Sequence, residues 1–102
     1  MNILGTEYEL IHDDELAKDG QDGVCKVYTK EIRIRYADSM LDDADSQEDQ
    51  MKRYEEVLRH EIIHAFFFES GNPSWCEDEK LVDWLAMQFP KMAQVFKDYG
   101  CL

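Results

Sequence analysis

The sequence contains no apolar stretch near the roughly 18 residues that a membrane-spanning helix needs. Residues 1–7 have neither the basic n-region nor the apolar h-region of a secretion signal. Cysteine is scarce: Cys25, Cys76 and Cys101 form no CxxC pair, and any disulfide scheme leaves one of them unpaired. We therefore predict a cytoplasmic protein with three free thiols and no membrane partner.

Basic residues are also few, 11 against 23 acidic residues, which gives a formal net charge of -12. Binding to a phosphate backbone depends on clustered lysine and arginine that release counterions, and here these residues are scattered. We expect no direct nucleic-acid partner. The surplus of carboxylates most simply keeps a small protein soluble.

Internal repeats, low-complexity tracts and flexible linkers are absent from the 102 residues. A chain of this length fits one domain, because two halves would each be too small to bury a core. We predict a single domain over residues 1–102.

The first third of the chain alternates β-like runs with turn signals. The clearest run has strict period-two alternation, which places Ile32, Ile34 and Tyr36 on one face and Arg33 and Arg35 on the other. The predicted strands lie within residues 2–11, 24–29 and 31–36. A small N-terminal antiparallel sheet of about three strands is expected.

Helix signals dominate the remainder. Residues 47–69 lack glycine and proline, with Ser46 as N-cap and Gly71 in the C′ position, and are predicted to form one long helix. The acidic residues 38–49, which lead into it, are predicted to be an exposed connection.

A capping box at residues 74–77 predicts a second helix from Trp75. Pro90 should interrupt that helix, leaving a last short helix over residues 91–99 that Gly100 ends. The expected fold is α+β, with the sheet packed on the long helix and a C-terminal helix.

The long helix carries the motif HEIIH at residues 60–64. Histidines four apart lie on one helix face, so His60 and His64 can bind one zinc ion through two imidazoles. Glu61 is rotated by about 100°, which puts its carboxylate beside the metal as a general base for zinc-bound water. The motif predicts a metalloprotease-type site.

Catalytic zinc commonly has three protein ligands, so one more must come from elsewhere in the chain. The segment that follows the long helix offers several side chains of the required chemistry. The candidates are Cys76, Glu77, Asp78, Glu79 and Asp83.

HEIIH followed by EKLVD at residues 79–83 resembles the gluzincin pattern HExxH…ExxxD. Residues 59–66, the ESG end at 69–71 and residues 81–90 resemble small metallopeptidase-like proteins of bacteriophages and mobile elements, distantly similar to ImmA/IrrE. The resemblance implies a zincin-like peptidase domain with Glu79 as third ligand. It further implies that Asp83 accepts a ring proton from a liganding histidine, and that the substrate is a protein or peptide such as a host or element-encoded regulator.

No motif singles out a donor for the transition state, for which His12, Tyr36, Tyr54 and Tyr99 are the candidates. The strand at residues 31–36 is expected to lie at a sheet edge and bind an extended peptide, with Arg33 and Arg35 favouring acidic substrates.

Two other functions fit the sequence. In the first, the same ligands hold a catalytically silent zinc-stabilised interaction module, and Glu61→Gln would leave its function intact. In the second, the carboxylate-rich segment 42–49 makes the chain an acidic DNA mimic that occupies a basic host protein.

Overall fold

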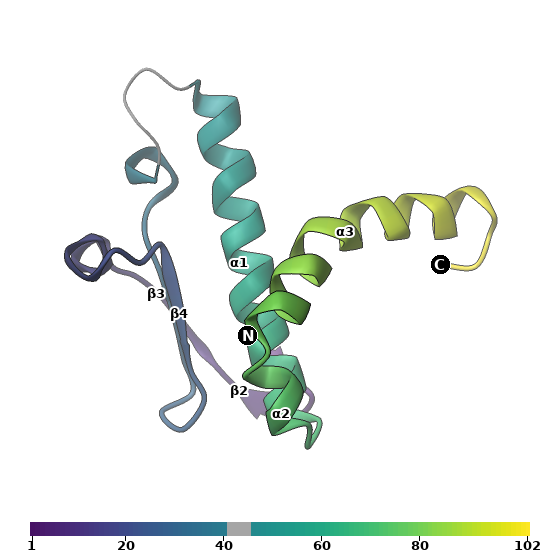
Figure 1. Cartoon of the computed structure of the whole chain (residues 1–102), viewed down its shortest axis with the longest axis horizontal. Coiled ribbons are helices and arrows are strands. Elements are labelled where there is room, and N and C mark those ends of the chain that lie inside the picture. The colour runs from purple at the N-terminus through teal and green to yellow at the C-terminus, as the bar shows by residue number, and fades with distance from the viewer. Residues whose placement is uncertain (41–45) are drawn as a thin grey trace.

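The computed structural model describes residues 1–40 and 46–102 and confirms the α+β class (Figure 1). A long helix, α1, has strands on one side and the C-terminal helix α3 on the other (Figure 1). The elements are β1 (Asn2–Ile3), β2 (Thr6–Glu7), β3 (Glu9–His12), the 3-10 helix η1 (Asp14–Asp19), β4 (Gly23–Lys26), β5 (Glu31–Ile34), the 3-10 helix η2 (Ala37–Ser39), α1 (Gln47–Glu69), α2 (Pro73–Cys76) and α3 (Glu79–Asp98).

The strands form a β1-β2 antiparallel hairpin and a mixed three-stranded sheet in the order β3-β5-β4. β4 pairs with β5 antiparallel, as predicted, but β3 pairs with β5 in parallel. The prediction of a wholly antiparallel sheet is therefore only partly correct. The expectation that residues 31–36 form a sheet edge is wrong, because β5 is the central strand. Both backbone sides of β5 are used in the sheet, so peptide addition there is excluded.

The alternation of β5 is confirmed at Ile32 and Ile34, which are fully buried. Tyr36 departs from it, because the strand ends at Ile34 and the Tyr36 ring stacks on His12 with centroids 4.8 Å apart. The core lies between the sheet and α1. Its two buried clusters are Ile3, Tyr8, Ile32 and Ala65, and Ile34, Met40 and Val57.

The predicted ends of α1 are confirmed. The Ser46 hydroxyl accepts a hydrogen bond from the Asp49 amide at 3.1 Å, and Gly71 follows the helix with a φ of +83°. Of the predicted acidic connection, residues 41–45 lie outside the described part of the chain, and these include half of the segment 42–49 on which the DNA-mimic alternative depends.

The second long helix begins at Glu79 and not at Trp75 as predicted. Asp78 is its N-cap and accepts a hydrogen bond from the Leu81 amide at 3.1 Å. The predicted capping box at residues 74–77 does not form, because Ser74 lies inside the single turn α2, whose N-cap Asn72 makes no side-chain cap hydrogen bond and whose C-cap is Glu77. Pro73 in the first turn of α2 and the carboxylate cap of Asp78 at the start of α3 divide the segment into two helices.

Pro90 does not interrupt α3 as predicted, since the helix continues to Asp98. Proline lacks an amide hydrogen, so the carbonyl of Ala86, four residues earlier, has no helical donor. The Arg59 side chain of α1 supplies it, with Nε donating to the Ala86 oxygen at 2.8 Å. None of the described helices is long and apolar enough to cross a membrane.

Candidate metal centre

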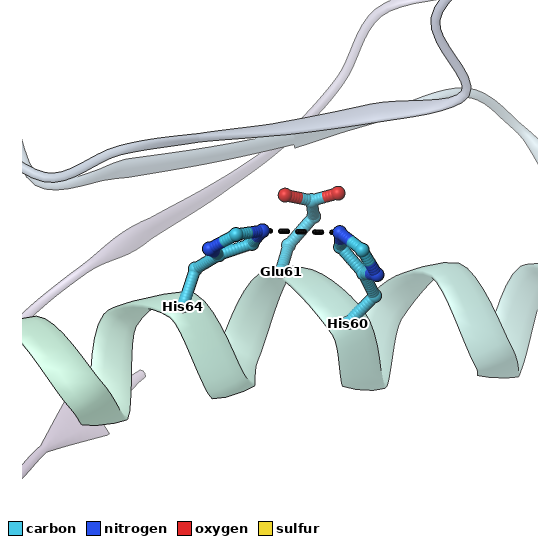
Figure 2. Close-up of side chains that lie close together, drawn as sticks. All are labelled: His60, Glu61 and His64. Carbon is cyan, nitrogen blue, oxygen red and sulfur yellow. Dashed lines mark hydrogen bonds between the residues drawn. The ribbon is translucent and has the colours of Figure 1, made fainter. Parts of the chain in front are cut away.

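α1 directs His60, Glu61 and His64 toward the strands that cover it, and the two rings converge (Figure 2). Residues four apart share a face, and the intervening Glu61 points between the rings toward the sheet (Figure 2). Glu61 and His64 are buried, and His60 is only 19% exposed. Three polar groups thus meet at the boundary between helix and sheet.

The two histidines and Glu79 form a tight triangle of donor atoms. The Nε2 atoms of His60 and His64 are 3.0 Å apart. Glu79, on the first turn of α3, places Oε2 at 3.1 Å from His60 Nε2 and Oε1 at 3.1 Å from His64 Nε2. Tetrahedral zinc with bonds of about 2.0–2.2 Å separates neighbouring donors by roughly 3.3–3.6 Å, so a small outward shift of these side chains would accommodate the ion.

The other ring nitrogens have their own acceptors. His60 Nδ1 is 2.8 Å from Asp83 Oδ1, and His64 Nδ1 is 2.5 Å from the carbonyl oxygen of Cys76. A carbonyl and a carboxylate only accept, so both Nδ1 atoms donate, and a neutral ring with this tautomer has its lone pair on Nε2. In that state two lone pairs and the Glu79 carboxylate would face one point, an arrangement that suits a cation.

Glu61 lies at the same centre, since His60, Glu61 and His64 each offer an atom within 4.8 Å of the others. Burial, together with the negative charges of Glu79 and Asp83, raises the pKa of Glu61 to about 8. A carboxylate whose affinity for a proton is raised in this way is suited to accept one. A cation at the triangle would favour the charged form and bring this pKa down again.

Gly23 brings β4 against this carboxylate. A Cβ atom at Gly23 would lie 2.8 Å from Val57 Cγ1 and 3.1 Å from both Cγ and Oε2 of Glu61. The sequence indicated only a turn here, because a close approach between segments 38 positions apart leaves no local pattern. Glycine in a strand does, however, signal close backbone approach in general.

An open groove runs between α1 and β4 past the centre. One part, of about 500 Å³, is lined by both histidines, Glu61, Glu79 and Cys25 among others, and a second part of about 160 Å³ by Arg53, Glu56 and Asp83. Burial raises the pKa of the Cys25 thiol to about 12, so this groove residue is a thiol and not a thiolate.

The remaining ligand candidates are directed elsewhere. The Cys76 sulfur is 4.0 Å from His64 Nδ1, on the ring side opposite the triangle. Asp78 caps α3, and Glu77 lines the groove without joining the triangle. Among the described residues, Glu79 lies beside both histidines and Asp83 contacts the His60 ring.

The expected transition-state donors do not gather at the centre. His12 Nε2 is 2.8 Å from the Tyr54 hydroxyl, and the His12 ring stacks on Tyr36. These three residues form a separate cluster. Tyr99, at the end of α3, is 85% exposed. None of the four lines either part of the groove.

No family model, curated protein or solved structure matches the chain.

Proposed function

We propose that the chain is a zinc-dependent peptide-bond hydrolase in which His60, His64 and Glu79 bind the metal. The observation that carries the proposal is the cluster of donor atoms: two imidazole nitrogens and a carboxylate face one point, while Asp83 and the Cys76 carbonyl fix both rings from behind. Such outer hydrogen bonds orient histidine ligands in zinc sites.

When bound, zinc would polarise a substrate carbonyl and lower the pKa of a coordinated water. Glu61 would take a proton from the attacking water and pass it to the nitrogen of the leaving amine. Glu61 lines the groove but is largely buried, and this burial raises its pKa, which suits it to both transfers.

The proposed substrate is an extended protein segment, such as a host or element-encoded regulator. Within the described sheet β4 has only β5 as a neighbour, so its other edge carries unpaired backbone groups along the groove. We also propose that the chain resides in a reducing compartment such as the cytoplasm, because Cys25, Cys76 and Cys101 are all free thiols.

The metal is tested by elemental mass spectrometry on purified wild type and on His64→Ala and Glu79→Ala. We expect about one zinc per wild-type chain and loss of zinc in both variants. Glu77→Ala is the matched control, because it removes a groove carboxylate outside the triangle and should retain zinc. A wild type that binds no zinc after reconstitution would exclude the site.

Catalysis is tested separately with Glu61→Gln, which keeps the shape of the side chain but cannot accept the proton. Zinc content should stay unchanged, while cleavage of an unfolded protein or a peptide library should fall by about 10²–10⁴-fold. Equal cleavage by wild type and variant would show that Glu61 is not the base.

A zinc-stabilised interaction module is the second candidate. It is favoured because neither part of the groove is lined by any of the four candidate donors, His12, Tyr36, Tyr54 and Tyr99. Here the metal would hold α1 against α3 and no bond would be cleaved. Zinc bound by a wild type without hydrolytic activity, together with unchanged partner binding by Glu61→Gln, would support this candidate over the hydrolase.

A further inference from the structure

The C-terminal half of α3 extends away from the rest of the molecule (Figure 1). The radius of gyration is 14.5 Å, against roughly 13 Å for a compact domain of this length. Of the buried residues of α3, Val82 and Ala86 both lie in its first half. From Pro90 onward the helix is therefore supported by little of its own chain.

This projecting half is nonetheless apolar along one side. Residues spaced alternately four and three apart form what we term the α3 stripe: Leu85, Phe89, Met92, Phe96 and Tyr99. Phe89 is 51% exposed, Phe96 37% and Tyr99 85%. A 4-3 repeat of large apolar residues is the pattern by which one helix packs along another.

An apolar groove lies where α3 separates from α1. Its volume is about 400 Å³, its exposed wall is entirely apolar, and it is lined by Arg59, Ile62, Ile63, Phe66 and Phe89. The Arg59 guanidinium is held by the Ala86 carbonyl, so its aliphatic stem faces the groove. Phe89 belongs to both surfaces, which makes the stripe and the groove continuous.

Charge indicates which partner covers these surfaces. Residues 84–102 carry Lys91, Lys97 and Asp98, a net charge of +1, whereas residues 1–83 carry the other 22 acidic and nine basic residues, a net charge of -13. The projecting half of α3 is thus the part of the chain that an acidic body attracts. The body of a second copy supplies that charge and also an apolar groove.

We propose that two copies of this chain associate reciprocally, with the α3 stripe of each lying in the apolar groove of the other. Stripe and groove are each used twice, as a two-fold symmetric contact requires. The two α1–α3 pairs then form a four-helix arrangement, in which the apolar faces are covered on both sides. This proposal is independent of zinc and of hydrolysis.

Sedimentation velocity over a concentration series of the full chain tests the association, and the wild type should reach twice the chain mass. Phe96→Asp in the stripe and Phe66→Asp in the groove should each weaken it by at least about a hundredfold, because each buries two carboxylates per dimer in an apolar contact. Leu4→Asp is the matched control, an equally drastic change at an exposed residue in the β1-β2 turn, and should dimerise normally. Circular dichroism establishes that each variant is folded.

Mixing the two variants tests the reciprocal geometry. The Phe66→Asp chain keeps an intact stripe and the Phe96→Asp chain an intact groove, so the mixture should recover one of the two contacts and form a heterodimer. Normal dimerisation of Phe66→Asp would overturn the proposal, because stripes would then pack on each other. A wild type that stays monomeric at every concentration would also overturn it. If that monomer sediments with phosphatidylglycerol vesicles, the occupant of the stripe is a lipid surface and not a second copy.

Discussion

At the scale of single residues, the position of the Glu61 carboxylate depends on the missing side chain of Gly23. In Gly23→Ala the new methyl group would collide with Val57 and contact Glu61. We expect a loss of about 1–3 kcal/mol in stability from overpacking, measured by urea unfolding. Cleavage activity should fall while zinc content stays at the wild-type level.

Shortening Val57 tests whether the loss of stability in Gly23→Ala is steric. Val57→Ala in the Gly23→Ala background removes the 2.8 Å contact, so the double variant should be more stable than the sum of the single changes predicts. Simple additivity would mean that the methyl group acts elsewhere.

A second prediction for a single residue concerns the ion pair of Glu69. Its carboxylate accepts hydrogen bonds from Lys30 Nζ and the Tyr8 hydroxyl, each at 3.0 Å, and these, the lysine first, hold the pKa of Glu69 below its usual value. A lowered folded-state pKa adds stability above the unfolded pKa that is lost as pH falls through the folded pKa. The urea midpoint should therefore decline in acid, and less steeply in Glu69→Gln. Equal slopes for both proteins would contradict this role.

At the scale of elements, the placement of α3 on α1 depends on a proline and an arginine. Arg59→Met leaves the Ala86 carbonyl without its donor, which should cost about 1–3 kcal/mol. Pro90→Ala restores a helical amide hydrogen for the same carbonyl. In the double variant Arg59→Met should therefore cost less than in the wild type. A double-mutant cycle in urea measures the coupling, and a coupling of zero would show that the Arg59 hydrogen bond does not compensate for Pro90.

How much of this was predictable from sequence depends on how local each feature is. The ends of α1 at Ser46 and Gly71, and the shared face of His60 and His64, follow from neighbouring residues and were predicted. The continuity of α3 through Pro90 was not, because the compensating donor comes from another helix.

The central place of β5 was also missed, since period-two alternation identifies a strand but not its neighbours. Glu79 and Asp83 were reached through a motif resemblance, and their contacts with His60 depend on the packing of α3 against α1.

At the scale of the whole molecule, the proposed metal joins α1 to α3, so its removal should destabilise the fold. With free zinc a hundredfold above its Kd, binding adds about 2.7 kcal/mol. We expect a lower melting temperature in a chelator and recovery on adding zinc. Glu77→Ala should behave like wild type, whereas His64→Ala should not respond to zinc. A wild-type melting temperature indifferent to both treatments would contradict a structural contribution of the metal.

The strand order has a consequence for how the chain assembles as it is synthesised. β5 is the last of the three strands to leave the ribosome, yet it lies between the other two, so β3 and β4 have no partner in this sheet until residue 34 has emerged. The β1-β2 hairpin can close early, but in the larger sheet only β4 and β5 form a hairpin, and β3 pairs with β5 in parallel. Its two outer strands must wait, and the arrival of one short segment completes both pairings at once.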